Sequence, residues 1–464
     1  MALTEVAVVG GGITGLAAAH QLRQLMPPEQ ITLIDKSPQL GGKIQTEHVG
    51  GFIIEAGPDS FLSTKSGAVE LCQALGLTDR LVGTLPAGYR SSVRRGGRLY
   101  ELPEGITGLI PSRLAPLLFS PLLSLQGRAR ASLDLVLPRR REDGEESIAG
   151  FVRRRLGDEA WDWLVEPLLS GIYAGDGAML SIDATFPQLP AIEREHGSLI
   201  RGMTRQPRGS APAPAPFLTP RGGLGELVAA LEASLADCRL LRGHAVIGLG
   251  AGGPGYLLKL DDGTMLRARS VLLAAPAFVS ARLVAPLDSE LSARLDAFGF
   301  TSTATVALAF PETAVARPLR GYGYLRPRAE GGPIVACTWV SAKWPGRAPA
   351  GQLLLRAFIG RDGCEEAAGW PEEDLIRLVR EELGEVLGLS AEPTLTRIHR
   401  WPRGMPQYSL GHRGRLAQAE RCLARHPGLA IAGHSYHGIG IPDCIRSGQR
   451  AARSLAEDRS AVTV

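Results

Sequence analysis

A glycine-rich turn between a short apolar segment and an Ala-rich segment constrains this chain more than any other feature. The turn consists of Gly10, Gly11, Gly12, Ile13, Thr14 and Gly15, and it follows the apolar residues 6–9. Glycines at this spacing let the backbone turn tightly and approach a pyrophosphate at the N-terminus of the following helix. A second apolar run, residues 31–34, completes a strand–helix–strand unit with parallel strands. The pattern predicts a dinucleotide-binding domain of the Rossmann type.

An acidic residue at the end of the second strand supports this prediction. Asp35 lies 20 residues beyond Gly15, where a carboxylate binds ribose hydroxyls, and Lys36 follows it. These features alone do not distinguish NAD from FAD. Two further segments make that distinction, and they contain Gly41, Gly42 and Lys43, then Gly57, Pro58, Asp59 and Ser60. The glycine pair resembles the second flavin motif of the amine oxidase and phytoene desaturase superfamily, which favours FAD.

A second glycine-containing loop lies near the C-terminus. It contains Gly433, His434, Ile439, Gly440 and Ile441, and it ends at Pro442, a favoured first residue of a helix. The positive end of such a helix stabilises the negative charge that a reduced flavin develops around N1 and its C2 carbonyl. We therefore expect this loop to cradle the isoalloxazine ring, so that the two ends of the chain meet around the cofactor.

Several motifs along the whole chain resemble the protoporphyrinogen/coproporphyrinogen oxidase family. They are the flavin segments above and residues 168–176, 193–200, 338–345 and 405–408. The chain is most similar to the Gram-positive bacterial type, which oxidises coproporphyrinogen III to coproporphyrin III in haem biosynthesis, with oxygen as acceptor and hydrogen peroxide as by-product. The resemblance implies an α/β fold with a Rossmann-type FAD-binding domain, like those of p-hydroxybenzoate hydroxylase and amine oxidases. It also implies a mixed-sheet substrate domain and a small helical domain.

The resemblance and the changes of composition along the chain give predicted domain boundaries. Residues 1–85, 206–290 and 406–464 are expected to form the FAD-binding domain, residues 86–205 a helical, membrane-facing domain and residues 291–405 the substrate domain. We expect strands over residues 242–249, 256–260 and 270–275, with a hairpin turn at 261–263. An amphipathic helix is expected over 371–387 and a terminal helix from Pro442.

The resemblance also implies site residues beyond those in the glycine motifs. Val246 would contact the adenine of FAD through its backbone, and Trp401 would contact the flavin, although Trp401 and His434 could instead be packed residues between lobes. The implied substrate contacts are Lys65, Arg90, Gly175 and Asp176. Cationic side chains are expected there because the substrate carries propionates. Where other members carry a carboxylate-binding arginine, this chain has Ser91, with Arg94 nearby.

No catalytic base is assigned, because none of the nine histidines belongs to a recognisable triad. His196 and His437 could relay protons or could be surface residues. The cofactor carries the difficult chemistry, so the protein need only orient the substrate, exclude water and stabilise the reduced flavin.

Composition excludes several classes of protein. A net charge of +4 and an aromatic content of 5% give no sign of nucleic-acid binding. Six scattered cysteines without CxxC pairs predict no metal site and a reduced, cytoplasmic compartment. No apolar run reaches the roughly 20 residues of a membrane span, and the N-terminus does not read as a secretion signal. Residues 109–125, with Arg113, Arg128 and Arg130, could rest on the inner face of a membrane or form buried helices.

The expected partners are the porphyrinogen and oxygen, with a ferrochelatase as a candidate recipient of the product, and the chain is expected to be a monomer or a homodimer. Three alternatives stay open. They are a protoporphyrinogen IX oxidase, another flavin amine oxidase or desaturase-like enzyme, and a flavin-binding assembly factor without turnover. Amine oxidases normally place an aromatic pair against the flavin, and this sequence does not identify such a pair.

Overall fold

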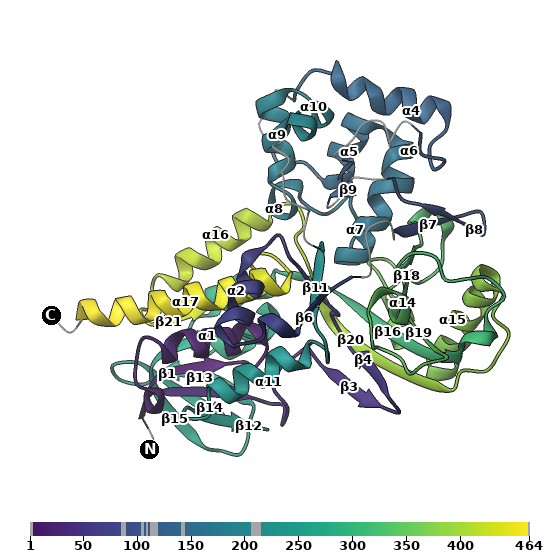
Figure 1. Cartoon of the computed structure of the whole chain (residues 1–464). Helices are drawn as coiled ribbons and strands as arrows, with labels where there is room; N and C mark the ends of the chain where they lie inside the picture. The colour runs from purple at the N-terminus through teal and green to yellow at the C-terminus, as the bar shows by residue number, and fades with distance from the viewer. Residues whose placement is uncertain are drawn as a thin grey trace.

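The computed structural model of the chain has three lobes (Figure 1). It describes residues 3–84, 90–103, 106–107, 110–111, 119–140, 144–205 and 215–462. Both ends of the chain lie in one lobe, which is built on a seven-stranded sheet. A second seven-stranded sheet forms another lobe, and the third lobe consists of helices.

The first sheet is mostly parallel. Across the sheet its strands are β12 (Arg239–Arg242), β2 (Ile31–Asp35), β1 (Leu3–Val9), β15 (Met265–Leu273), β14 (Tyr256–Leu260) and β13 (Val246–Ala251), with β21 (Leu429–Ile431) also beside β15. Strands β12, β2, β1, β15 and β21 pair in parallel, whereas β13 and β14 form an antiparallel extension. Parallel sheets need helices on both faces, because their strands are buried on both sides.

Alternate residues of β1 enter two separate cores. Val6 and Val8 pack with one group of helices, whereas Ala7 and Val9 pack with another. The first group is α1 (Ile13–Arg23), α2 (Ser66–Ala74), α11 (Gly225–Ser234) and α17 (Ile441–Val462). The second group is α12 (Ala277–Val284), α13 (Ser289–Asp296) and α16 (His412–Leu423). The period of two along a strand thus explains how one short strand serves both layers.

The second sheet is mixed. Across the sheet its strands are β20 (Leu395–Gln407), β16 (Gly299–Pro311), β19 (Gln352–Ile359), β18 (Ile334–Trp339), β17 (Gly323–Leu325), β7 (Ser91–Arg95) and β8 (Arg98–Glu101). Helix α15 (Glu372–Leu387) covers one face, and its buried residues Leu375, Val379 and Leu383 recur every four positions. On the other face lie α14 (Val340–Lys343) and the hairpin of β3 (Thr46–Val49) and β4 (Phe52–Glu55).

The helical lobe has its own apolar core. Its helices are α4 (Leu125–Ser132), α5 (Ile148–Leu156), α6 (Asp158–Ala160), α7 (Glu166–Tyr173), α8 (Ile182–Thr185), α9 (Gln188–His196) and α10 (Leu199–Arg205), with a π-helical turn at Trp161–Val165 and a 3₁₀ turn at Leu133–Leu135. Arg155 and Asp134, both fully buried, form an ion pair of 2.6 Å inside this core. Helix α7 lies at the end of the lobe where it meets the second sheet (Figure 1).

The remaining elements are short. The remaining strands are β5 (Phe61–Leu62), β11 (Phe217–Pro220) and β6 (Leu81–Gly83), which pair with one another, and β9 (Ile106–Thr107) with β10 (Ile110–Pro111). The remaining 3₁₀ helices are η1 (Pro28–Gln30), η2 (Thr78–Arg80), η5 (Glu312–Ala314), η6 (Arg328–Glu330) and η7 (Glu365–Gly369).

Several sequence predictions of elements are confirmed and one is wrong at its start. Residues 261–263 form the expected turn between the antiparallel strands β14 and β15, and the terminal helix begins at Ile441, one residue before the expected start. The strand predicted over 242–249 is confirmed from Val246 onward, as β13, but its predicted start is wrong. Gly243 has a φ of +74° and its amide donates to the carbonyl of Ser37, so a turn separates β12 from β13.

Residues 91–101 belong to the second sheet, although the predicted boundaries placed them in the helical domain. Strand β7 pairs in parallel with β17, and β8 pairs with β7. The other predicted boundaries stay a prediction.

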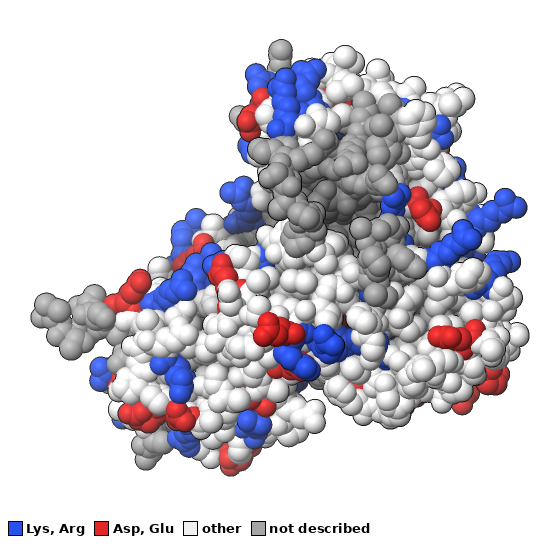
Figure 2. All heavy atoms as spheres, viewed as in Figure 1, with Lys and Arg blue, Asp and Glu red and all other residues white. Residues whose placement is uncertain are grey.

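Figure 2 shows acidic and basic side chains interspersed over the two sheet lobes, with a group of basic side chains at the far end of the helical lobe.

Candidate active site

The glycine-rich turn is packed too tightly for side chains at several of its positions. Gly10 has a φ of +110°, and its amide donates to the carbonyl of Ile34 at 2.8 Å. A Cβ atom on Gly15 would lie 1.8 Å from the carbonyl oxygen of Gly10. Gly12 differs, because the nearest atom to a Cβ there is the Cα of Gly42 at 3.9 Å. The two glycine motifs therefore face each other, with open space beside Gly12.

The first turn of α1 has no acidic side chain of its own. The helix also has no side-chain hydrogen bond at its N-cap, Gly12. The first N–H groups of such a helix lack partners and carry partial positive charge, which suits a phosphate group. Gly12 through Gly15 thus present a backbone surface of the kind that a pyrophosphate needs.

Asp35 is fixed at the end of β2 beside this surface. Its carboxylate accepts hydrogen bonds from the amides of Gly11 at 2.6 Å and Ser37 at 2.7 Å. Its carbonyl accepts from the amide of His244 at 3.1 Å, which brings the segment that leads to Val246 next to Asp35. Lys36 is exposed immediately after it. The structure therefore brings together the residues predicted for the ribose and adenine.

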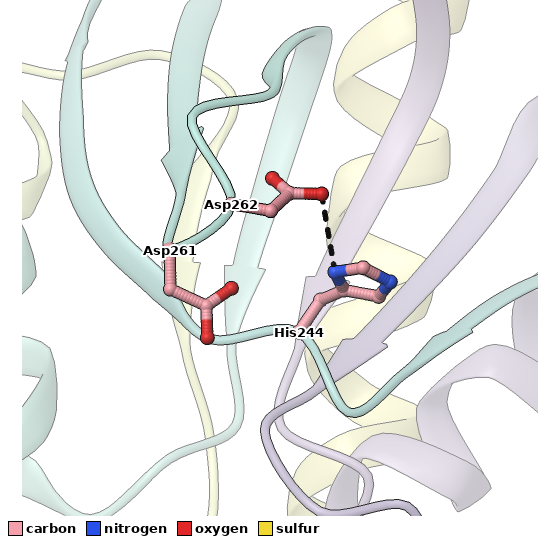
Figure 3. A group of neighbouring side chains, drawn as sticks. All are labelled: His244, Asp261 and Asp262. Atoms are coloured by element: carbon pink, nitrogen blue, oxygen red, sulfur yellow. Dashed lines mark ion pairs between the residues drawn. The ribbon is translucent and has the colours of Figure 1, made fainter.

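A small polar cluster lies near this edge. His244, Asp261 and Asp262 have ligand atoms within 4.8 Å of one another, and His244 Nδ1 lies 3.4 Å from Asp262 (Figure 3). Both carboxylates are exposed, and the pair joins the turn before β13 to the turn after β14. The cluster fits a solvent-exposed link between two turns, and we assign it no metal.

The C-terminal loop packs directly on the start of α1. A Cβ atom on Gly433 would lie 3.4 Å from the Thr14 hydroxyl, and one on Gly448 would lie 2.2 Å from the Thr14 carbonyl oxygen. Helices α1 and α17 therefore lie in close contact, side by side in the same lobe (Figure 1). The expectation that the two ends of the chain meet is confirmed.

Lys43 and His434 form a buried pair between segments that are far apart in the sequence. Lys43 Nζ lies 2.9 Å from His434 Nε2 and also donates to the carbonyl of Gly404. Burial lowers the pKa of Lys43 to about 8. Burial, together with the adjacent lysine, holds the pKa of His434 well below its usual value. His434 is thus neutral and accepts from the lysine through Nε2.

Gly57 and Trp401 lie beside this pair. A Cβ atom on Gly57 would be 2.2 Å from the Lys43 carbonyl oxygen and 3.7 Å from the Trp401 ring. The indole N–H of Trp401 donates to the carbonyl of Ala56 at 3.0 Å. Trp401 therefore has a packing role in the protein, whatever contact it makes with a cofactor.

The side chain of Asp59 is occupied by the protein itself. It contacts Lys343 at 3.1 Å, Arg356 at 3.2 Å and the Trp344 indole N–H at 3.3 Å. Burial alone would raise the pKa of Asp59, but Lys343 and Arg356 hold that pKa well below its usual range. Any cofactor contact by Asp59 would therefore come from its backbone.

Tyr408 is a candidate that spacing rules did not single out. Its hydroxyl donates to the His434 carbonyl and accepts from the Gly438 amide, each at 2.7 Å. Its ring stacks on His412 with centroids 4.0 Å apart. Burial raises the pKa of Tyr408 well above its usual value and lowers the pKa of His412 to about 4. A neutral Tyr–His stack therefore holds the loop that contains Ile439, Gly440 and Ile441.

The predicted substrate residues occupy three places. Lys65 pairs with Asp443 at 2.6 Å, at the start of α17, and its side chain is 49% exposed. Gly175 packs on the end of β20, where a Cβ atom would lie 2.2 Å from Gln407 Oε1. The Asp176 carboxylate accepts from the amide of Ala178 and so closes its own turn. Arg90 lies just before β7, and its carbonyl accepts from the Tyr322 amide.

Arg94 is not available for a propionate. Its guanidinium contacts Glu330 and Glu385, each at 2.5 Å, and Glu382 at 3.2 Å. Its side chain is only 9% exposed. The idea that it might anchor substrate beside Ser91 is wrong, because three carboxylates of the second lobe occupy it.

The two candidate proton relays lie at the surface of their lobes. His196 is 3.6 Å from Glu195, at the end of α9. His437 is 3.8 Å from Glu420 of α16, and burial, more than the nearby Arg450, lowers its pKa. Neither geometry indicates a role in proton transfer.

The described residues contain no helix long and apolar enough to cross a membrane. Of the run predicted to rest on a membrane, residue 109 and residues 112–118, which include Arg113, lie outside the described residues. Arg128 donates to the carbonyls of Ser120 and Leu123, and Arg130 donates to carbonyls at the end of α5. These two arginines therefore cap protein backbone.

The residues present fit a flavin dinucleotide. The open glycine surface, the uncapped helix and the carboxylate at the end of β2 supply the elements that a dinucleotide pyrophosphate and ribose require. A family model described as flavin containing amine oxidoreductase matches residues 13–456.

The chain belongs to this family. The predicted flavin cofactor and the predicted α/β fold class are confirmed by this membership. A coproporphyrinogen III oxidase of Bacillus subtilis is 41% identical to this chain, and the match covers 96% of this chain and 97% of the relative. A human protoporphyrinogen oxidase is 32% identical, over 97% of this chain and 98% of the relative. The resemblance to the protoporphyrinogen/coproporphyrinogen oxidases is thereby confirmed.

Solved structures agree with this placement. A putative protoporphyrinogen oxidase from Exiguobacterium superposes with a TM-score of 0.88 and 33% identity, covering 99% of this chain and 100% of the other. A cyclohexylamine oxidase from Brevibacterium oxydans has a TM-score of 0.70 at 17% identity, covering 98% and 99% of the two chains. The second likeness shows the shared fold alone.

Proposed function

We propose that this flavin enzyme oxidises coproporphyrinogen III to coproporphyrin III in haem biosynthesis. The observation that carries the proposal is the 41% identity to a coproporphyrinogen III oxidase along nearly the whole of both chains. Coproporphyrinogen III oxidases of Propionibacterium freudenreichii and Staphylococcus aureus, at 35% and 32% identity, support the same substrate.

We propose that FAD lies across the carboxyl ends of β1 and β2. The start of α1 would bind the pyrophosphate, Asp35 the ribose and the backbone of Val246 the adenine. When bound, FAD accepts the electrons of the substrate and passes them to oxygen. The other proposed contacts are Lys36, Gly42, Lys43, Gly57, Pro58, Asp59, Ser60, Trp401, His434, Ile439, Gly440 and Ile441.

The protein would contribute orientation and charge. Loss of six electrons and six protons converts the porphyrinogen into the porphyrin, which reduces three molecules of oxygen to three of hydrogen peroxide. No residue is assigned as a base. Lys65 is held by Asp443 at 2.6 Å, so a substrate propionate would compete with this carboxylate for the ammonium group. Arg90, Gly175 and Asp176 complete the proposed substrate contacts.

Anaerobic addition of coproporphyrinogen III to the purified yellow protein tests this proposal. We expect the flavin absorbance near 450 nm to bleach, and admission of air to restore it as red porphyrin fluorescence develops. A flavin-binding assembly factor would show neither change. A protein that bleaches with coproporphyrinogen III but is not reoxidised by air would contradict the proposed role of oxygen.

Protoporphyrinogen IX is the second candidate substrate, supported by the relatives from human and from rice, which are 32% and 30% identical. This substrate carries two propionates, whereas coproporphyrinogen III carries four. Comparison of kcat/KM for the two substrates decides between them. A preference of about tenfold or more for protoporphyrinogen IX, equal to 1.4 kcal/mol, would overturn the assignment of the copro substrate.

We also propose cytoplasmic residence with peripheral contact at the inner face of a membrane, as a monomer or homodimer that can pass its product to a ferrochelatase. The helical lobe exposes Phe119, Leu125 and Val136, which are 78%, 81% and 77% accessible. Exposed apolar side chains of this kind suit an interfacial surface. Full recovery in the soluble fraction at low salt would contradict membrane contact.

A further inference from the structure

The segment after α7 adopts a backbone conformation that needs support from its surroundings. Ala174, at the end of α7, has a φ of 50°, in the left-handed region that residues with a Cβ atom rarely adopt. It is also only 6% exposed. Such residues persist where surrounding contacts fix them, and they concentrate at functional sites. We call residues 173–176 the α7 loop.

Three successive carbonyls of the α7 loop accept hydrogen bonds from the second lobe. The Tyr173 carbonyl accepts from Gln407 Nε2 at 2.8 Å, and the Ala174 carbonyl accepts from the Asp362 amide at 2.7 Å. The Gly175 carbonyl accepts from an Arg328 terminal nitrogen at 3.2 Å. The donors come from η6, the turn after β19 and the end of β20. The loop is therefore attached to the sheet lobe although its chain belongs to the helical lobe.

Arg328 contributes more than one of these attachments. Its other terminal nitrogen donates to the carbonyl of Asp362 at 2.8 Å. One guanidinium group therefore links Gly175 to Asp362, whose amide donates to the Ala174 carbonyl. The backbone amide of Arg328 donates to Glu166 Oε2 at 2.9 Å, at the start of α7. Glu166 is itself held by the Ser170 hydroxyl at 2.5 Å. Arg328 therefore contacts both ends of α7.

We propose that Arg328 is a positioning residue, which fixes the α7 loop against the second sheet and thereby determines which porphyrinogen the site accepts. The inference rests on the proposed function, in which Gly175 and Asp176 contact the macrocycle. The planar, forked guanidinium suits this role because it binds two carbonyls in fixed directions, which the point charge of a lysine cannot do. Arg328 would act through its hydrogen bonds to Gly175 and Asp362.

Arg328→Met, Arg328→Lys and a matched control test the proposal in the FAD-loaded enzyme. The control is Arg317→Met, because the exposed Arg317 also donates to two backbone carbonyls, those of Glu385 and Val386 at 3.1 Å each, at the end of α15. We expect Arg328→Met to raise the KM for coproporphyrinogen III by roughly 10- to 100-fold, more than it changes kcat, because the loop is displaced. The ratio of kcat/KM for the copro and proto substrates should fall, with a smaller fall in Arg328→Lys and none in Arg317→Met.

Hydrogen–deuterium exchange provides a second measurement that does not depend on turnover. The amide of Asp362 should exchange faster in Arg328→Met than in the wild type, because its acceptor Ala174 is released. Unchanged selectivity together with unchanged exchange at residue 362 would overturn the proposal. If Arg328→Met does not accumulate as folded protein, the same two measurements on Arg328→Lys decide. If the wild type oxidises neither porphyrinogen, the proposed function fails, whereas the exchange measurement still decides whether Arg328 fixes the loop.

Discussion

The glycine turn of the first lobe and the arginine cluster of the second lobe hold their parts of the molecule in opposite ways. At Gly10 and Gly15 the absence of side chains allows backbone to meet backbone. Around Arg94, the long side chains of Glu330, Glu382 and Glu385 converge from distant parts of the chain. The first arrangement leaves polar backbone groups available for a ligand. In the second arrangement the polar groups form ion pairs with one another, so the cluster stabilises the substrate lobe and binds no ligand.

Gly15→Val should have the largest effect, and it tests whether the backbone contact is essential. A Cβ atom at this position would lie 1.8 Å from the Gly10 carbonyl oxygen, which belongs to the backbone and cannot rotate away. We expect purified protein with no bound FAD, or no soluble protein. The control is Gly414→Ala in α16, where a Cβ atom would meet nothing within 4 Å. Full FAD content in Gly15→Val, measured by absorbance, would contradict the tight turn.

Arg94→Met tests the other side of the comparison. Loss of Arg94 leaves the largely buried Glu330 without its ion pair and removes one partner of the buried Glu382, which keeps Arg326. Breaking a buried ion pair costs about 3–5 kcal/mol of unfolding free energy. FAD content and the KM for coproporphyrinogen III should stay near those of the wild type, because Arg94 binds no ligand. Chemical denaturation and steady-state kinetics check the two expectations. Arg98→Met, at an exposed position of β8, serves as the control. A large rise in KM with unchanged stability would restore Arg94 as a substrate residue.

Lys43→Met should have the smallest effect of the three and reports on charge in the cofactor site. A hydrogen bond to a charged group contributes about 1.5–3 kcal/mol, so FAD should bind roughly 10- to 100-fold more weakly. The pKa of Lys43 without the cofactor is about 8. An anionic cofactor favours the protonated lysine, so binding takes up a proton above pH 8. The affinity of the wild type should therefore be greatest below pH 8 and fall as pH rises above it.

The pH dependence is measured by titrating the apoprotein with FAD at several pH values. Lys43→Met should lose the decrease in affinity above pH 8, whereas Lys259→Met, at an exposed position of β14, should keep it. An unchanged slope in Lys43→Met would show that another group takes up the proton.

The same comparison explains how much of this structure could be predicted. The Rossmann unit was predictable because its glycines act locally, between strand, turn and helix, and Asp35 follows at a fixed interval. Lys43 was predictable as a site residue, but its partners His434 and Gly404 were not, since they lie 391 and 361 positions away. Tyr408 was placed in a motif, yet its bonds to the C-terminal loop follow from the packing of α16 and β20.

The errors have the same physical origin. Arg94 was considered for substrate binding because of its position next to Ser91, whereas its partners come from η6 and α15. The strand predicted over 242–249 was wrong at its start, because Gly243 makes a turn whose hydrogen bond reaches Ser37 and β13 begins only at Val246. Local patterns determine backbone conformation, but they do not identify which distant charges will meet.

The close packing of α17 on α1 has a consequence for how the molecule is made. The ribosome releases the glycine turn first, yet its neighbour Gly448 emerges more than 400 residues later. During that interval the apolar face of α1, with Leu16 and Ala19 in the mature core, lacks the part of its cover that α17 provides. Loading with the nucleotide should therefore follow the completion of synthesis, and shielding of α1 by a chaperone would serve the nascent protein until then.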